Sequence, residues 1–220
     1  MSRAPGSSKP TRRILQEGVS CWRLAPAGRV AVLIDGAAYY AALLDALPQA
    51  RSRIMILGWD FDPRVRLDPT DPATELRRLL PALVESSLDL HVHLLIWDVS
   101  LVFGPSRALD HLIDSGWQQH PRVHLRFDGQ HPFAAAHHEK IVCIDDALAF
   151  VGGIDLTVQR WDTSEHHLEQ AVRRDPDGEP YHPVHDLQMA VDGAAAGAVA
   201  ELARGRWADA TGDTWAPCGG

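Results

Sequence analysis

The sequence predicts an α/β fold in which a layered mixed sheet is flanked by helices. Short apolar runs alternate with segments of helical periodicity along most of the 220 residues. Hydrophobic residues make up 45% and charged residues 23%, as in folded globular domains. Strands separated by helices are typical of layered sheets. We therefore expect one domain over residues 20–210, between a disordered lead-in at 1–19 and a flexible tail at 211–220.

The amino-terminal half alternates strand and helix signals. Apolar side chains recur at helical spacing after Asp35-Gly36, and Pro69 and Pro72 mark a turn before the next periodic segment. The expected elements are strands at 29–34, 53–59 and 90–97, helices at 37–47, 74–86 and 105–115, and a turn at 68–72. Two of these strands end in a Trp-Asp pair, for which an aromatic plug is the preferred interpretation over a ligand contact.

The carboxyl-terminal half predicts mainly strands. Asp145-Asp146 joins two apolar runs and indicates a tight turn. Residues 173–183 (RRDPDGEPYHP) predict a long polar loop, and its charged start at 173–175 is expected to be solvated. The expected strands are 123–127, 140–144, 147–151 and 185–191, followed by an alanine-rich helix at 194–207.

Composition argues against several classes of protein. No run approaches the ~18 apolar residues of a membrane-spanning helix, and the polar amino-terminal segment predicts no secretory leader. A net charge of −8 gives no strong nucleic-acid signal. The three cysteines are too scattered for a disulfide framework or a zinc site. A reducing, cytoplasmic location is expected, with peripheral binding at the inner membrane face as a possibility.

His138 and Lys140 are the strongest candidates for chemistry. On a regular strand, residues two apart share a face, so the imidazole and the ammonium would project together. Such a pair suits attack on a phosphate. The lysine would bind a nonbridging oxygen, while the imidazole attacks phosphorus or protonates the leaving oxygen.

Other polar and glycine positions lie close behind this pair. Gly152-Gly153 would let backbone N–H groups approach an anion, and Asp155 would orient the lysine or a substrate hydroxyl. Asp145 is an odd number of residues from Lys140, so it is expected in the turn, where it would hold backbone amides or an arginine.

These residues, at this spacing, resemble the HxKxxxxD motif of the phospholipase D superfamily. The similarity covers residues 20–210. It rests on the segments 34–36 (IDG), 58–62 (GWDFD), 138–145 (HEKIVCID), 152–156 (GGIDL) and 160–163 (RWDT). The resemblance implies one half of a pseudo-twofold fold, and it includes Asp145 among the motif's catalytic residues.

The resemblance also implies a mechanism. Two such motifs meet, one histidine becomes a phosphohistidine, and the other protonates the leaving alcohol. By this likeness His138 is the expected nucleophile, with Asp186 orienting its ring. No cofactor or metal is expected. The implied activity is hydrolysis or transphosphatidylation of a phospholipid substrate at a membrane surface.

The chain departs from the family pattern because it holds a single motif. Lys9 is the only other lysine, so no second His-x-Lys exists. The chain is therefore expected to pair as a homodimer or to be the amino-terminal half of a longer enzyme with a C-terminal motif half. The alternatives are cardiolipin synthase-like phosphatidyl transfer, a nuclease of the same superfamily, and a noncatalytic half domain that binds lipid phosphate.

The remaining histidines allow a weaker, metal-binding interpretation. Glu165 with His166 and His167, or His185-Asp186 beside His137-His138, could supply ligands. Because these pairs fall on predicted strands and polar loops, the expectation is no metal. His137 points away from His138 on a strand and is expected to be packed or hydrogen-bonded.

Overall fold

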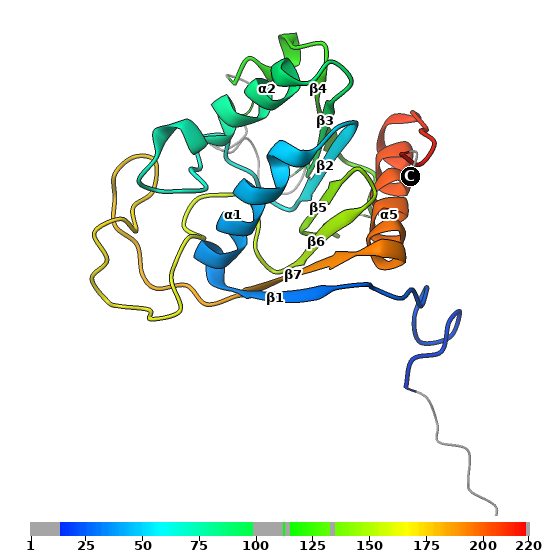
Figure 1. Ribbon diagram of the computed structural model, residues 1–220, viewed down its shortest axis with the longest axis horizontal. Helices are drawn as coiled ribbons and strands as arrows, with labels where there is room; N and C mark the ends of the chain where they lie inside the picture. The colour runs from blue at the N-terminus through cyan, green and yellow to red at the C-terminus, as the bar shows by residue number, and fades with distance from the viewer. Residues whose placement is uncertain (1–13, 99–111, 113–114, 133–134, 219–220) are drawn as a thin grey trace, which may run out of the picture.

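The computed structural model describes residues 14–98, 112, 115–132 and 135–218, within which a seven-stranded sheet lies between helices (Figure 1). The strands are β1 (Val30–Ile34), β2 (Arg53–Gly58), β3 (His91–Trp97), β4 (Val123–Asp128), β5 (Ile141–Ile144), β6 (Leu148–Gly152) and β7 (Leu187–Asp192). The helices are α1 (Asp35–Ala46), α2 (Leu76–Ser86) and α5 (Gly193–Thr211), with 3-10 turns η1 (Leu47–Gln49), η2 (Pro72–Thr74) and η3 (Trp117–Gln119). The predicted α/β class is confirmed.

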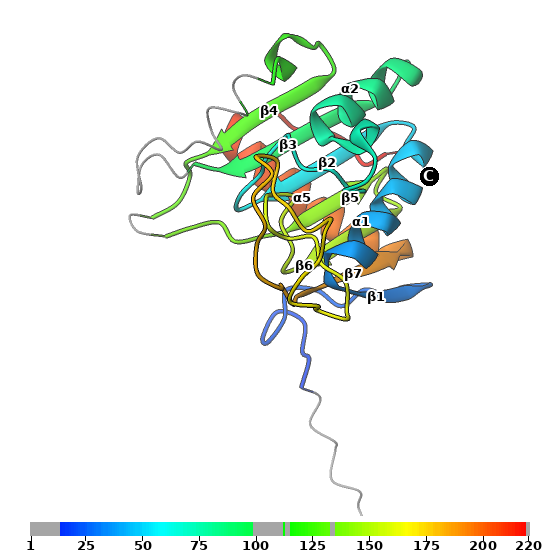
Figure 2. The same ribbon diagram turned by 90° about the vertical axis from the view of Figure 1, so that its left-hand side faces the viewer.

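The order and directions of the strands decide which strand ends lie at each edge of the sheet. It is β1-β7-β6-β5-β2-β3-β4, with β2, β3 and β4 mutually parallel and the other neighbouring pairs antiparallel. The carboxyl ends of β1, β2, β3, β4 and β6 therefore meet the amino ends of β5 and β7. We call this the His138 end of the sheet, because His138 lies in the segment leading into β5. The loop of residues 153–186 lies at this end, toward the viewer in Figure 2.

Every predicted strand is present, with shifted ends. β5 begins at Ile141 and β7 at Leu187, so Lys140 and Asp186 each come just before a strand. His138 also precedes β5, in a segment without regular structure. The predicted helix at 105–115 falls on residues outside the described part of the chain, apart from 112 and 115.

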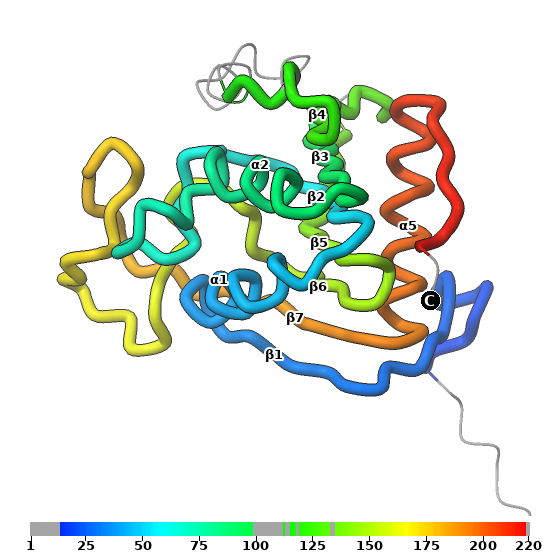
Figure 3. Tube along the Cα trace, turned by 45° about the horizontal axis from the view of Figure 1, so that its top comes forward, coloured from blue at the N-terminus to red at the C-terminus, as the bar shows by residue number. Residues whose placement is uncertain are grey.

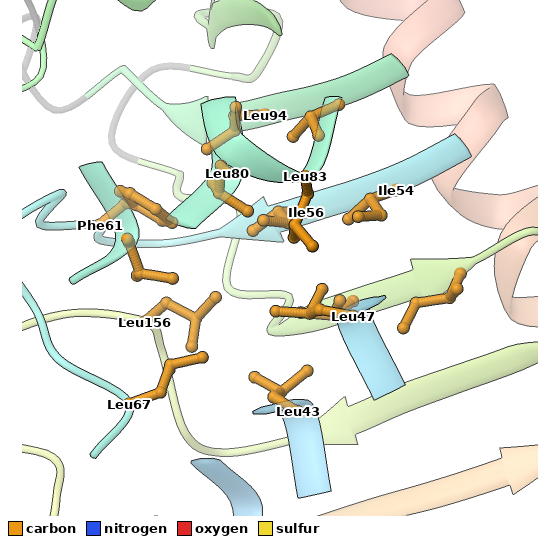
Figure 4. Close-up of a cluster of buried hydrophobic side chains, with 14 of the residues drawn as sticks. Leu43, Leu47, Ile54, Ile56, Phe61, Leu67, Leu80, Leu83, Leu94 and Leu156 are labelled. Atoms are coloured by element: carbon orange, nitrogen blue, oxygen red, sulfur yellow. The ribbon is translucent and has the colours of Figure 1, made fainter. Parts of the chain in front are cut away.

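Each face of the sheet has its own core. Helices α1 and α2 cover one face, where leucine, isoleucine and aromatic side chains interlock (Figure 4). Helix α5 covers the other face (Figure 3), and its buried Ala196, Ala200 and Ala203 let the helix backbone approach the strands closely. Burial of a large apolar side chain contributes about 1.5–3 kcal/mol, so the two cores hold the sheet and its polar ends in place.

The described residues nearest the chain ends make several contacts. In the described part of the expected lead-in, Gly18 donates to the carbonyl of Cys21. In the expected flexible tail, the Trp215 ring packs 4.2 Å from that of His93, and Cys218 donates to Asp146. Two residues of the expected tail, Trp215 and Cys218, thus contact the rest of the domain. Among the described residues, no helix combines the length and apolar composition that crossing a bilayer requires.

Candidate active site

His138 and Lys140 each lie near the same indole ring at the His138 end of the sheet. Trp59 follows β2; its ring centroid lies 5.8 Å from that of His138 and 5.7 Å from Lys140 Nζ. Both side chains lie near this ring although both residues precede β5, so strand alternation is not the cause. The Lys140 carbonyl accepts from Gly152 N and Gln188 Nε2, which fixes the backbone at this point. His138 is exposed, whereas Lys140 is only 6% exposed.

Lys140 forms a buried ion pair near the Trp59 ring. Lys140 Nζ is 2.9 Å from Asp155 Oδ2, and Asp155 Oδ1 accepts from Trp59 N at 3.0 Å. Burial raises the pKa of Asp155 above its usual value, against the opposing effect of Lys140 and the backbone amides of Trp59 and Asp60. Asp155 thus contacts the lysine, the first of its two expected roles. The ammonium nitrogen is itself buried, and the contact with Asp155 uses at most one of its three N–H donors.

The glycine pair serves the fold and not an anion. Gly152 N donates to the Lys140 carbonyl and Gly153 N to the Leu187 carbonyl, so both amides are used within the sheet. The expectation that these amides bind substrate is therefore not supported. A Cβ atom on Gly153 would overlap the carboxylate of Asp186, and one on Gly152 would overlap the backbone of β7. Glycine is needed here for close approach between strands.

Asp145 lies away from the site. It follows β5, so about five residues of strand, or ~16 Å, separate it from Lys140. Its carboxylate accepts from the backbone N–H groups of Arg51, Ser52 and Arg53 at 2.7–2.8 Å. The expectation that it holds backbone amides in the turn is confirmed. Its inclusion among the catalytic residues is contradicted by this position.

Asp186 does not hold the His138 ring in this structure. Its carboxylate accepts from Leu187 N at 2.7 Å and lies against Gly153, and no hydrogen bond joins it to His138 in the described part of the chain. The reason is the strand order: β6 lies between β5 and β7, which puts their leading segments about 9–10 Å apart. The expectation that Asp186 contacts and orients the His138 ring is therefore not met in this structure.

Aromatic and histidine side chains surround the His138 ring. Trp59 stacks on Trp97 with ring centroids 5.7 Å apart, and Trp97 Nε1 donates to His131 Nε2 at 3.0 Å. His137 lies 3.1 Å from the Gln130 carbonyl, which confirms the expected hydrogen-bonded histidine. The repeated Trp-Asp pair was the sequence signal for the stacked Trp59 and Trp97. An aromatic plug, the preferred interpretation, did not include the proximity of Trp59 to His138 and Lys140.

A second polar cluster lies beside Asp186. Asp35, His166 and His185 place one nitrogen or oxygen atom each within 4.8 Å of one another. The sequence suggested His166 and His185 in separate metal sets and gave no role to Asp35. Asp35 is buried at the junction of β1 and α1, a place that local patterns do not reveal.

The polar loop near this cluster is anchored by a buried arginine. Arg173 is 1% exposed, and its Nη1 lies 2.9 Å from Asp162 Oδ1. Its other nitrogens donate to the carbonyls of Tyr181, His167 and Leu168. The expectation of a solvated run at residues 173–175 is therefore wrong for Arg173.

Comparison with known proteins identifies the family. A sequence profile of the family described as Phospholipase D matches residues 118–216, which include the whole His138 motif. Phospholipase D zeta 1 of Arabidopsis thaliana is 31% identical over 171 residues, 74% of this chain and 14% of that protein. The chain belongs to the phospholipase D superfamily. It spans 8–14% of the length of the curated phospholipases D that it matches.

Solved structures show the same superfamily fold. The phospholipase D family member Nuc from Salmonella typhimurium aligns with a TM-score of 0.51 at 15% identity, over 82% of this chain and 96% of that one. A phosphatidylserine synthase from Haemophilus influenzae also aligns with a TM-score of 0.51, at 12% identity, over 82% of this chain and 39% of the other. At these identities the likeness establishes the fold, and superfamily membership establishes phosphodiester chemistry in the homologues.

Proposed function

We propose that this chain provides one half-site of a phospholipid phosphodiesterase or transphosphatidylase, with His138 as the nucleophile. The observation that carries the proposal is the exposed His138 imidazole, which shares the Trp59 ring with the buried Lys140–Asp155 pair. A nucleophile must be open to substrate, and the cation beside it must be held in place before the reaction. The exposure of His138 and the fixed position of Lys140 support the proposal.

In the proposed reaction, a ring nitrogen of His138 attacks phosphorus and forms an N–P bond. The bond from phosphorus to the head-group oxygen breaks, and that oxygen takes a proton from a second imidazole. Water or another alcohol then attacks the phosphohistidine, gives its proton to the second imidazole, and releases phosphatidate or a new phospholipid. Lys140 stabilises the charge on the phosphoryl oxygens through the donors that Asp155 leaves free.

The second imidazole has to come from outside this motif, because His138-x-Lys140 is the only such pair in the sequence. We infer that a second copy of the chain, or a further half in a longer protein, supplies it. The alignment with nearly the whole Nuc chain supports the first arrangement, since a unit of this size accounts for 96% of that family member.

The composition of the site favours lipid over nucleic acid. The stacked Trp59 and Trp97 give the site an apolar wall, and the net charge of −8 opposes binding of a polyanion. Phosphatidyl transfer of the cardiolipin synthase type uses the same intermediate and differs only in the accepting alcohol. A noncatalytic phosphate-binding half domain is the remaining candidate, and the single His-x-Lys pair of the sequence supports it.

The test is turnover of phosphatidylcholine, phosphatidylglycerol and single-stranded DNA by the active assembly and by His138→Ala. We expect lipid turnover that falls by on the order of 10³-fold or more in this variant. His167→Ala, a change at an exposed loop histidine, is the matched control and should keep wild-type turnover. Retained activity in His138→Ala would refute the role of His138 as the nucleophile. DNA turnover without lipid turnover would show that the substrate is a nucleic acid and not a phospholipid.

A further inference from the structure

The Asp35–His166–His185 cluster joins two parts of the chain that are far apart in the sequence. Asp35 starts α1 directly after β1, whereas His166 and His185 both lie in the loop of residues 153–186, His185 just before β7. Asp35 Oδ2 is 3.3 Å from His166 Nε2, and Asp35 Oδ1 is 2.8 Å from His185 Nδ1. The two imidazole rings meet edge to face, with centroids 5.2 Å apart.

The carboxylate of Asp35 is buried and incompletely satisfied. Asp35 is 1% exposed; its Oδ1 accepts from Asp186 N as well as facing His185. Oδ2 has no hydrogen-bond partner among the described residues, because the neighbouring His166 nitrogen is outside hydrogen-bonding geometry. A buried carboxylate oxygen without a donor is costly, and such an atom calls for a ligand that carries positive charge.

His166 is held in the orientation that a metal ligand requires. Its Nδ1 is 3.2 Å from Asp162 Oδ2, so a proton on Nδ1 leaves Nε2 free to face Asp35. Asp162 is fixed in turn by Arg173 and by Val184 N. Carboxylate-backed histidines of this kind are typical of metal sites, where the outer carboxylate sets the tautomer and the ring orientation.

The spacing of the donor atoms fits a small divalent ion. Ligands about 2.0–2.1 Å from a tetrahedral zinc ion lie about 3.3 Å from one another, the distance between Asp35 Oδ2 and His166 Nε2. Two imidazoles and one carboxylate suit Zn²⁺ better than Mg²⁺ or Ca²⁺, which prefer oxygen ligands.

We propose that Asp35, His166 and His185 bind one zinc-like divalent transition metal ion, with solvent as the fourth ligand. The ion would replace the direct Asp35–His185 contact and tie the polar loop to the β1–α1 junction. Because Asp186 follows His185 and lies against Gly153, the ion would also fix this corner of the His138 end. The proposal is independent of the proposed catalytic role of His138.

The test is metal titration of the full chain after treatment with EDTA. Addition of ZnCl2 should bind one ion per chain and raise the melting temperature by about 5–10 °C at 100 times the dissociation constant. Co²⁺ should give the visible absorption of a tetrahedral site. His185→Gln removes a ligand whose side chain is 69% exposed, so this variant should fold and lose both signals. His166→Gln should do the same.

The neighbouring change His167→Gln is the matched control and should bind like the wild type. Circular dichroism of each EDTA-treated variant separates loss of binding from loss of fold. Wild-type chain that binds no Zn²⁺ or Co²⁺ would overturn the proposal. So would His185→Gln and His166→Gln variants that are folded and bind as strongly as the wild type, because the ion would then occupy another histidine group.

Discussion

Both ends of the sheet carry histidines, and their surroundings differ. At the His138 end, the imidazole is exposed, and a buried ion pair lies near the same Trp59 ring. Toward the opposite end, His93 and His124 stack with ring centroids 4.7 Å apart, and His93 packs against Trp207. Burial lowers the pKa of His93 to about 3, with His124 adding to the effect. The comparison teaches that solvent exposure and a fixed charge nearby distinguish a candidate catalytic histidine. A cluster of stacked histidine rings alone does not.

The carboxylates of Asp155 and Asp145 show the same contrast between the two ends of the sheet. Asp155 lies at the His138 end and neutralises a buried lysine, while Asp145 lies at the opposite end and holds three backbone N–H groups. Both are needed by the fold, but only the first touches a motif side chain. Separate substitutions can therefore break one role and leave the other intact.

The largest effect on stability is expected from Asp155→Ala. This change leaves the Lys140 ammonium buried without a counter-charge, and we expect the free energy of unfolding to fall by about 3–5 kcal/mol. Urea unfolding followed by tryptophan fluorescence measures it. The double variant Asp155→Ala/Lys140→Met removes the charge as well and should recover most of the loss. Additive losses in the double variant would show that the pair is not coupled.

An intermediate effect is expected from Asp145→Ala. The loss of three charge-assisted contacts at the start of β2 should lower the free energy of unfolding by about 1–3 kcal/mol. Turnover per folded molecule should stay at the wild-type level, because the carboxylate is remote from His138. Active-site titration beside the unfolding measurement separates the two. A large fall in turnover at full folding would restore Asp145 to the catalytic set.

A smaller effect is expected from pH, through His93. Its pKa is about 6.5 in the unfolded chain and about 3 in the fold, so only the unfolded chain gains a proton between these values. Stability should therefore fall as the pH drops below about 6.5, by about 2 kcal/mol at pH 5. His93→Leu should lose this component in urea unfolding at pH 7 and pH 5. Equal pH dependence in both proteins would contradict the buried, neutral state of His93.

Much of the fold could be predicted from local patterns. The strand around Cys143 follows from its apolar run, and the turn at Asp145-Asp146 follows from two residues that tolerate a positive φ, here 50° and 58°. The motif spacing was enough to find His138 and Lys140. Their proximity to Trp59 depends on the pairing of β2 with β5, which no local pattern encodes.

The errors all concern tertiary contacts that local sequence patterns do not encode. Gly152 and Gly153 suggested an anion site, but Asp186 and the first residues of β7 pack directly against them. Arg173 resembled a solvated residue because its partner Asp162 lies across a turn of the loop. Asp35 gave no signal because its two histidines follow it by more than a hundred residues. Such contacts are set by tertiary packing.

The most direct test of the central claim is to trap the covalent intermediate. The active assembly would be quenched during turnover of a short-chain phosphatidylcholine and digested, and the peptides would be sequenced by mass spectrometry at neutral to alkaline pH, where phosphohistidine survives. We predict a phosphatidyl adduct on His138 that is absent from His138→Ala. An adduct on a different residue of this motif, or steady turnover with an unmodified His138 and no trapped enzyme, would contradict the account.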